Sequence, residues 1–292
     1  MKNKLTIFLF HEVSSKPSEF SKQYNLNVSP KIFRIQVNWI KRNYNIIDPS
    51  ELINKTNIPK NSALITFDDG FMGAFENGIS YLVENKIPSI MFLNMEHVIN
   101  NSPLISAEAI FYEKYCKEIK SNNYNNLHLI LTPKEKKKIL KKINSNYYNE
   151  INEYQGQLAD LETLSKFSNE QFVYFGNHLY SHWNSLALSD SEYEFNILEN
   201  KRILNKFKNN IDFLSLPNGQ YNRHKIKILN KIKLLKVFSS SGKINDNFND
   251  FILDRISLTE FEYNSVKLYL RIIKSKTKNY FFKKFLGLLR KI

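Results

Sequence analysis

Cysteine is almost absent from the sequence, and its absence excludes two kinds of stabilising site. Cys116 is the only cysteine in 292 residues, so neither an intrachain disulfide nor a cysteine zinc cluster can form. Long apolar runs are also missing, because no stretch approaches the roughly 20 apolar residues that span a bilayer. A hydrophobic content of 42% excludes general disorder. We expect a folded chain in a reducing compartment, large enough for one α/β barrel or two domains.

The sequence shows no signal peptide. The apolar run 5–10 is too short for the hydrophobic region of such a peptide, and it ends at His11. We therefore expect a cytoplasmic protein.

Acidic residues are absent from the segment 264–292, which contains nine Lys or Arg. The segment therefore carries nine of the net +14 charges, which leaves +5 for residues 1–263. On a helical wheel that starts at Phe281, apolar side chains fill one arc and basic side chains the other. Such a pattern is typical of a helix that binds in the plane of an anionic membrane. A terminal helix that packs on the protein body would show the same pattern, and both interpretations stay open.

Strand and helix patterns alternate along most of the chain. Strands are expected at 5–10, 44–47, 64–67, 88–93, 172–176, 213–216, 237–240 and 251–256. Helices are expected at 30–44, from 49, at 74–85 and at 190–209. This order favours a parallel α/β architecture. Residues 14–30 are predicted to form a loop, and about 100–170 a mostly helical insertion.

Two adjacent carboxylates, Asp68 and Asp69, end the strand at 64–67 and precede Gly70. A strand end of this kind lies at the rim of a sheet or barrel, where α/β folds place their chemistry. Because side chains alternate along a strand, the two carboxylates should point in different directions. One could bind a metal while the other acts as a base. The alternative is an ordinary turn with two solvated acids.

Two histidines follow the strand at 172–176 with a spacing that suits a metal. His178 and His182 are four residues apart, which on a helical turn brings both imidazoles to one face. With a carboxylate from another strand end, they would form a set of two histidines and one carboxylate. His97 and His128 have no partner at such a spacing, and we expect both to be structural or surface residues.

A third motif, Pro217-Asn218-Gly219, follows the strand at 213–216. A turn of this kind can direct backbone N–H groups into a cleft, as the stabilisation of an oxyanion requires. Simple reversal of the chain explains the same residues at least as well.

Taken in order, the segments 66–70, 176–182 and 216–219 resemble the motifs of the polysaccharide deacetylases, which are NodB-like, metal-dependent carbohydrate esterases. The resemblance implies an α/β fold, an irregular (β/α)7 barrel. Here the barrel would span 1–263, with the helical insertion inside it, and a basic amphipathic tail would follow at 264–292.

The resemblance also implies roles for individual residues. The ligands of a divalent metal would be Asp69, His178 and His182. Zinc is the first choice, with cobalt, nickel or manganese as alternatives. Asp68 would be the general base, and the backbone N–H of Asn218, in the loop with Pro217 and Gly219, would bind the oxyanion. A metal in such a site polarises a carbonyl and lowers the pKa of water.

The sequence departs from the family pattern in three places. Leu179 stands where Ser or Thr is common, and Ser215 where an arginine that orients the base is common. We expect Arg255 to replace that arginine. No residue after His224 can be the C-terminal catalytic histidine of many members. Phe10-His11 is similar to the Tyr-His pair of a branch with an N-terminal catalytic histidine, and this resemblance implies that His11 is the general acid.

One main hypothesis and two alternatives follow. The main hypothesis is a metal-dependent hydrolase that removes the acetyl group from an N-acetylated amino sugar, in a glycan or in a lipid-linked or nucleotide-linked intermediate, at the inner membrane surface. A catalytically inactive glycan-binding barrel is disfavoured because all the metal and base residues are present. Nucleic-acid binding is not expected, because the apolar side chains of the tail are clustered and not interleaved with its charges.

Overall fold

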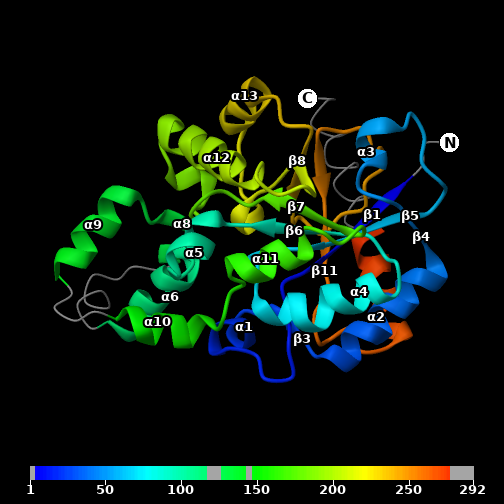
Figure 1. The fold of residues 1–292 in the computed structure, drawn as a ribbon, viewed down its shortest axis with the longest axis horizontal. Coiled ribbons are helices and arrows are strands. Elements are labelled where there is room, and N and C mark those ends of the chain that lie inside the picture. The colour runs from blue at the N-terminus through cyan, green and yellow to red at the C-terminus, as the bar shows by residue number, and fades with distance from the viewer. Residues whose placement is uncertain (1–3, 117–125, 143–146, 277–292) are drawn as a thin grey trace, which may run out of the picture.

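A parallel sheet rolled into a barrel forms the centre of the molecule (Figure 1). The structure is a computed structural model that describes residues 4–116, 126–142 and 147–276. Nine strands form the sheet in the order β10-β9-β8-β7-β6-β5-β1-β11, with β4 beside β5. They are β1 (Leu5–Phe10), β4 (Asn45–Ile46), β5 (Ser62–Phe67), β6 (Ser89–Leu93), β7 (Val173–Asn177), β8 (Asn210–Ser215), β9 (Lys236–Ser239), β10 (Ile252–Asp254) and β11 (Ile256–Ser257).

One short stretch of chain closes the barrel. β10 pairs with β9, β11 pairs with β1, and only Arg255 separates β10 from β11. If β10 and β11 are counted as one stretch and β4 is left aside, seven strand positions surround the barrel. Every pairing in this sheet is parallel. The predicted irregular seven-stranded α/β barrel is therefore confirmed.

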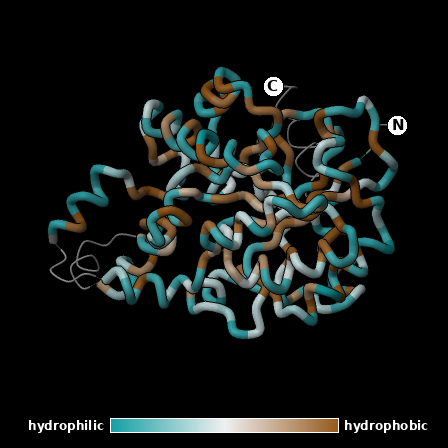
Figure 2. Tube along the Cα trace, viewed as in Figure 1, coloured by the Kyte–Doolittle hydropathy of each residue, from teal (hydrophilic) through white to brown (hydrophobic). Residues whose placement is uncertain are grey.

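The strands have near-continuous apolar sequences because both of their faces are buried. All residues of β1, β5 and β6 are buried. Alternate side chains, such as Ile7, Leu64, Phe92 and Phe238, form one core cluster. The others pack against the helices in a larger cluster that includes Phe10. Figure 2 shows hydrophobic and hydrophilic residues alternating along the helices that surround the sheet.

Helices surround the sheet, as expected for strands joined by crossovers. They are α2 (Pro30–Asn43), α3 (Glu51–Asn54), η1 (Ala74–Ile79) continued by α4 (Ser80–Glu84), α11 (Leu161–Phe167), α12 (Asp190–Leu204) and α13 (Arg223–Ile232). α12 begins with a capping box, in which Ser189 and Glu192 satisfy each other's backbone N–H groups. The predicted helices at 30–44, 74–85 and 190–209 are thus confirmed to within a few residues.

The insertion is helical in its described residues and gathers at one side of the barrel (Figure 1, left). Its helices, with the preceding α5, are α5 (Met95–Asn100), α6 (Ile105–Tyr115), α8 (Leu127–Ile130), α9 (Pro133–Lys142) and α10 (Tyr148–Gln155). The loop predicted at 14–30 is wrong in part, because it contains α1 (Glu19–Gln23) and β3 (Asn27–Val28). β3 pairs in parallel with β2 (Glu12–Val13), which lies just before the predicted loop. Ser18 caps α1, and Phe20 anchors it in the core.

The described part of the tail packs on the barrel. Residues 265–276 are helical, and Leu268 and Ile272 belong to the larger core cluster. Residues 277–292, which include the amphipathic pattern predicted from Phe281 onwards, lie outside the described residues. Among the described helices, none combines the length and the apolar character needed to cross a membrane.

Candidate active site

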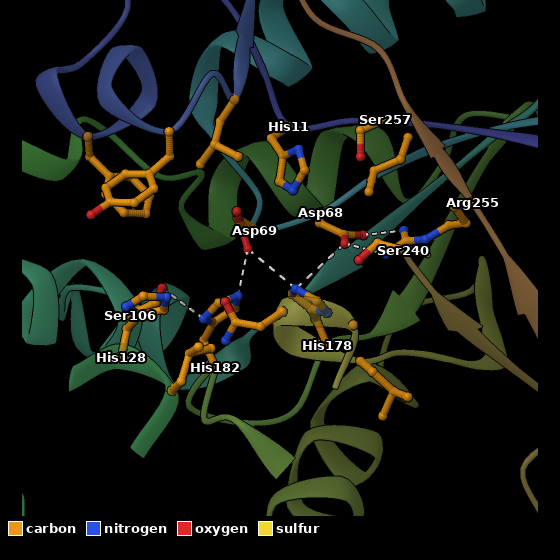
Figure 3. A pocket seen from close by; sticks show the side chains of 18 of the residues that line it. His11, Asp68, Asp69, Ser106, His128, His178, His182, Ser240, Arg255 and Ser257 are labelled. Atoms are coloured by element: carbon orange, nitrogen blue, oxygen red, sulfur yellow. Dashed lines mark hydrogen bonds and ion pairs between the residues drawn. The ribbon is translucent and has the colours of Figure 1, made fainter. Parts of the chain in front are cut away.

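The predicted catalytic side chains meet where the parallel strands have their carboxyl ends. His11 follows β1, Asp68 and Asp69 follow β5, and His178 follows β7. Together they line a cavity of about 370 Å³ (Figure 3). Chain segments far apart in the sequence therefore form one site, as is usual at this end of a parallel barrel.

The side chains of Asp69, His178 and His182 converge on one point. The Nε2 atoms of His182 and His178 lie 3.1 Å and 3.4 Å from Oδ1 of Asp69. This carboxylate oxygen is buried and accepts no hydrogen bond from the described residues. Ligand atoms around a tetrahedral zinc, with bonds of about 2.0–2.1 Å, would be ~3.3 Å apart. The three residues therefore fit a divalent metal of this size.

The two histidines do not lie on a helical turn, and this part of the prediction is wrong. Residues 178–184 form an irregular loop. Leu179 and His182 have left-handed backbone conformations, with φ of 62° and 53°. Asp69 and Asn218 are also left-handed, with φ of 73° and 58°. Non-glycine residues in this region are strained, and such strain is concentrated at functional sites.

Each histidine ring is fixed through its other nitrogen. Nδ1 of His178 lies 2.9 Å from the backbone carbonyl of Ser215. Because a carbonyl only accepts, Nδ1 carries the proton and Nε2 keeps a lone pair for a metal. Nδ1 of His182 lies 2.9 Å from the hydroxyl of Ser106, a residue of α6. Asn94 donates hydrogen bonds to the carbonyls of His178 and Leu179 and so holds the loop.

Asp68 binds Arg255, and its Oδ2 also lies 3.8 Å from Nε2 of His178 (Figure 3). Two guanidinium nitrogens of Arg255 donate to the two carboxylate oxygens at 2.7 Å and 2.6 Å, and the arginine is only 1% exposed. Ser215 lies between them, since its hydroxyl accepts from Arg255 and donates to Asp68. Arg255 lies at the barrel closure, between β10 and β11. That it replaces the arginine missing from the motif around Ser215 stays a prediction.

Electrostatics keeps both carboxylates ionised. Burial by itself would raise the pKa of Asp68, but Arg255, together with His178 and His11, outweighs burial and the pKa is lowered. The pKa of Asp69 lies well below its usual range. Burial would raise this pKa, but His182 and His178 together outweigh burial. Burial lowers the pKa of His11, and the two carboxylates oppose this effect in part. Asp68 is therefore available as a base, and His11 is neutral near pH 7.

The Pro217-Asn218-Gly219 motif forms the short helix η3 (Pro217–Gly219) after β8, and Asn218 and Gly219 line the cavity. Gly219 has φ of +64°, and a Cβ there would lie 2.3 Å from the hydroxyl of Ser240. Only glycine meets both conditions. The loop thus packs tightly between two strand ends, which fixes the backbone around Asn218.

The opposite wall of the cavity was not predicted. His128, on α8, lines the cavity with Tyr24 and Phe20, and the rings of Tyr24 and His128 are 6.4 Å apart. His128 is half-buried, so the expectation that it is structural or on the surface stays a prediction. His97 is buried and bonded to Ser102, in agreement with a structural role. No local motif marks His128 or Ser106, because both reach the site only through folding of the insertion.

The fold and the site together define a class of protein: a parallel α/β barrel with a two-histidine, one-aspartate ligand set beside an arginine-bound carboxylate. A polysaccharide deacetylase family profile matches residues 55–237, more than half of the chain. The chain belongs to the polysaccharide deacetylase family, and family membership supports deacetylation of a carbohydrate. The branch with an N-terminal catalytic histidine stays a prediction. A search of curated proteins finds no sequence match.

Solved deacetylase structures share the fold. The deacetylase PplD of Streptococcus pyogenes, solved with acetate, has a TM-score of 0.66 at 15% identity, over 93% of this chain and 99% of that one. IcaB of Ammonifex degensii has a TM-score of 0.61 at 14% identity, over 93% and 98%. A de-N-acetylase of Aggregatibacter actinomycetemcomitans has a TM-score of 0.59 at 14% identity, over 92% and 100%.

Proposed function

We propose that this protein is a metal-dependent hydrolase that removes the acetyl group from an N-acetylated amino sugar. One observation carries the proposal: a single cavity holds a fitting ligand set, Asp69 with two histidines, next to the ionised carboxylate of Asp68. Hydrolysis of an amide needs a polarised carbonyl, an activated water and a proton for the leaving amine.

The ligand set would hold a divalent metal, zinc first and cobalt, nickel or manganese as alternatives. Bound there, the metal would polarise the acetyl carbonyl and make water a stronger acid. Asp68 takes a proton from the attacking water, and Arg255 keeps its carboxylate ionised and oriented. The C–O bond to acetate forms as the C–N bond of the amide breaks.

Two further groups would complete the reaction. The backbone N–H of Asn218, in a loop fixed by Gly219, is assigned to the negative oxygen that develops on the acetyl carbon. His11 lines the same cavity and is assigned to the transfer of the proton to the leaving amine. Because burial lowers its pKa, His11 is neutral before the reaction; it would accept the proton that Asp68 has taken from the water and pass it to the nitrogen of the leaving amine.

Acetate release from N-acetylglucosamine oligomers and from lipid-linked glycans, with and without chelator, tests the proposal. Wild-type protein should release acetate, chelator should stop the release, and added zinc should restore it. Asp68→Asn and His178→Ala should both be inactive. A protein that binds these glycans without releasing acetate, and without taking up metal, would be a glycan-binding barrel instead.

The shape of the cavity supports a sugar substrate. Its volume of about 370 Å³ is at the lower end of the range for small-molecule sites. One side is polar and catalytic, while Phe20, Tyr24 and Leu26 make the other side largely apolar. An amino sugar presents both polar edges and an apolar ring face, so it suits such a cavity.

We also propose that the segment 264–292 contacts an anionic membrane surface, which would bring the enzyme to lipid-linked substrates. Four apolar side chains in the described part of this segment are between 42% and 67% exposed. They are Val266, Tyr269, Leu270 and Ile273. Basic residues lie among them, and no acid occurs from 264 onwards. Exposed apolar groups flanked by cations are what an anionic bilayer surface binds.

Sedimentation with liposomes tests this contact. Wild-type protein should pellet with vesicles that contain phosphatidylserine and much less with phosphatidylcholine alone. A Tyr269→Asp, Leu270→Asp double variant should pellet less, while Phe195→Asp, at an equally exposed position on α12, should behave like the wild type. Equal pelleting of the double variant would contradict the contact.

A further inference from the structure

One side chain of the helical insertion, that of Ser106, forms a hydrogen bond with a candidate metal ligand. Ser106 lies in the first turn of α6, is 4% exposed and lines the cavity. Its hydroxyl oxygen is 2.9 Å from Nδ1 of His182. We infer that Ser106 is a positioning residue for His182, and that the insertion thereby completes the metal centre. This inference rests on the proposed function.

His182 depends on Ser106 more than His178 depends on any one side chain. The ring of His178 is held by the backbone carbonyl of Ser215, at the end of β8 in the rigid sheet. His182 lies in an irregular loop with a left-handed backbone. The hydrogen bonds to Asn196 fix the backbone of this loop at residues 180 and 181 but do not reach the ring of His182. The hydroxyl of Ser106 is the group that holds Nδ1 in the described structure.

Metal binding would determine which nitrogen of His182 carries the ring proton. For Nε2 of His182 to present a lone pair to a metal, Nδ1 must carry the ring proton. Nδ1–H therefore donates to the hydroxyl oxygen of Ser106. Outer partners of this kind orient metal-binding histidines, and their loss typically weakens metal binding about 10–100-fold.

The position of Ser106 is set by contacts inside the insertion. The backbone N–H of Leu104, just before α6, donates to the side chain of Gln155 on α10 at 2.5 Å. One turn further along, Glu108 is bound by Lys136 of α9 at 2.5 Å and by Tyr112 at 2.6 Å. Two other helices of the insertion, α9 and α10, thus place the start of α6. Metal binding and the order of the insertion should therefore be linked in both directions.

Metal affinity measured with purified full-length protein tests the inference. Zinc dissociation constants come from competition with a chelating indicator, and the visible spectrum of the cobalt form reports ligand geometry. Ser106→Ala should bind zinc about 10–100-fold more weakly and show an altered cobalt spectrum. Its metal-free melting temperature should be kept, because alanine is a better helix former than serine. Ser106→Thr, which retains a hydroxyl, should bind more tightly than Ser106→Ala.

Ser62→Ala is the matched control. Ser62 is a fully buried serine at the start of β5, at the opposite end of the strand from Asp68, and its hydroxyl donates to the carbonyl of Pro59 at 2.7 Å. It should bind zinc like the wild type. A second measurement is hydrogen exchange, in which zinc should slow exchange of the α6 amides in wild type and less so in Ser106→Ala.

Different outcomes would contradict the role of Ser106 and the proposed deacetylase function. Zinc binding by Ser106→Ala as tight as that of the wild type, or an equal loss in Ser62→Ala, would overturn the role of Ser106 and leave the deacetylase proposal intact. A wild-type protein that binds no zinc and is inactive with any metal would overturn the proposed function itself.

Discussion

Asp68 and Asp69 are neighbours in the chain but belong to different parts of the site. Asp68 binds the arginine at the barrel closure, while the left-handed backbone of Asp69 turns its carboxylate towards the two histidines. The sequence predicts this divergence, because side chains alternate at a strand end. The consequence is that the two residues can be tested separately.

Asp68→Asn should separate catalysis from metal binding. The variant keeps the shape of the side chain and removes the base, so the rate should fall about 10²–10⁴-fold. Zinc affinity should change little, because the convergent ligand atoms belong to Asp69 and the histidines. Acetate release and zinc content of the same preparation measure both effects. Loss of zinc from Asp68→Asn would show that Asp68 is itself a ligand.

Arg255→Lys should shift the pH dependence of the rate. Lysine keeps the charge but cannot make the two parallel hydrogen bonds to Asp68. It should therefore oppose the effect of burial less than arginine does, and the pKa of Asp68 should rise. Since Asp68 acts when ionised, the acid limb of kcat/KM should move to higher pH. Misplacement of the base should also cost on the order of 10²-fold in rate. An acid limb at the wild-type pH would contradict this assignment.

His97 should make the protein sensitive to acid. Burial, helped by the charge of His182, lowers the pKa of His97 to about 3 from an ordinary value of 6.5. Between these values the unfolded chain binds a proton that the folded chain does not, so stability falls as the pH drops below 6.5. The loss amounts to at most about 1.4 kcal/mol per pH unit.

Urea unfolding of metal-free His97→Gln and wild type between pH 7 and 4 measures this effect. The variant should lose less free energy of unfolding over the range than the wild type. Parallel curves would show that His97 does not contribute to the acid sensitivity.

The candidate site could be predicted where its residues lie in short motifs at strand ends, as Asp69 and His178 do. Arg255 could be expected only because the motif around Ser215 lacked its usual arginine. Ser106 could not be predicted, because it is 76 residues from its partner His182 and only the folded insertion brings the two together. The helical spacing of the histidines was misleading, because a chain in left-handed turns can also bring such residues to one metal.

The strands were the most predictable parts of the fold. Strands buried on both faces have continuous apolar sequences, and β1, β5 and β6 lie within a residue or two of their predicted bounds. α1 was missed because it is only five residues long and most of its side chains are polar. Helix α13 was also missed, although Asn222 caps it and its apolar residues recur at helical spacing.

The packing of β6 against β7 gives a test of the barrel interior. A Cβ on Gly176 in β7 would lie 2.5 Å from the ring of Phe92 in β6. That ring also lies under the guanidinium of Arg255, 5.5 Å away. Gly176→Ala should therefore cost about 1–3 kcal/mol of stability and lower activity by displacing Phe92. Adding Phe92→Leu should recover part of the stability, as thermal unfolding would show; a variant as stable as the wild type would contradict this packing.

The C-terminal segment divides into a part that stabilises the barrel and a part assigned here to the membrane. Leu268 and Ile272 are buried in the core, and each such side chain contributes about 1.5–3 kcal/mol. Deletion of 264–292 should therefore lower the free energy of unfolding by about 3–6 kcal/mol. It should also expose core residues of the barrel, so loss of liposome binding in this variant would prove little.

Deletion of 277–292 alone is the decisive variant, because the buried contacts of Leu268 and Ile272 remain. It removes five of the nine basic residues of the segment, so pelleting with anionic liposomes should fall strongly, while the melting temperature and acetate release from a water-soluble oligomer should stay at wild-type values. If liposome binding weakens while the barrel keeps its stability, contact with a membrane explains the basic charge of this segment. If stability falls as far as in the longer deletion, residues 277–292 pack on the barrel, and the contact with the membrane must be abandoned.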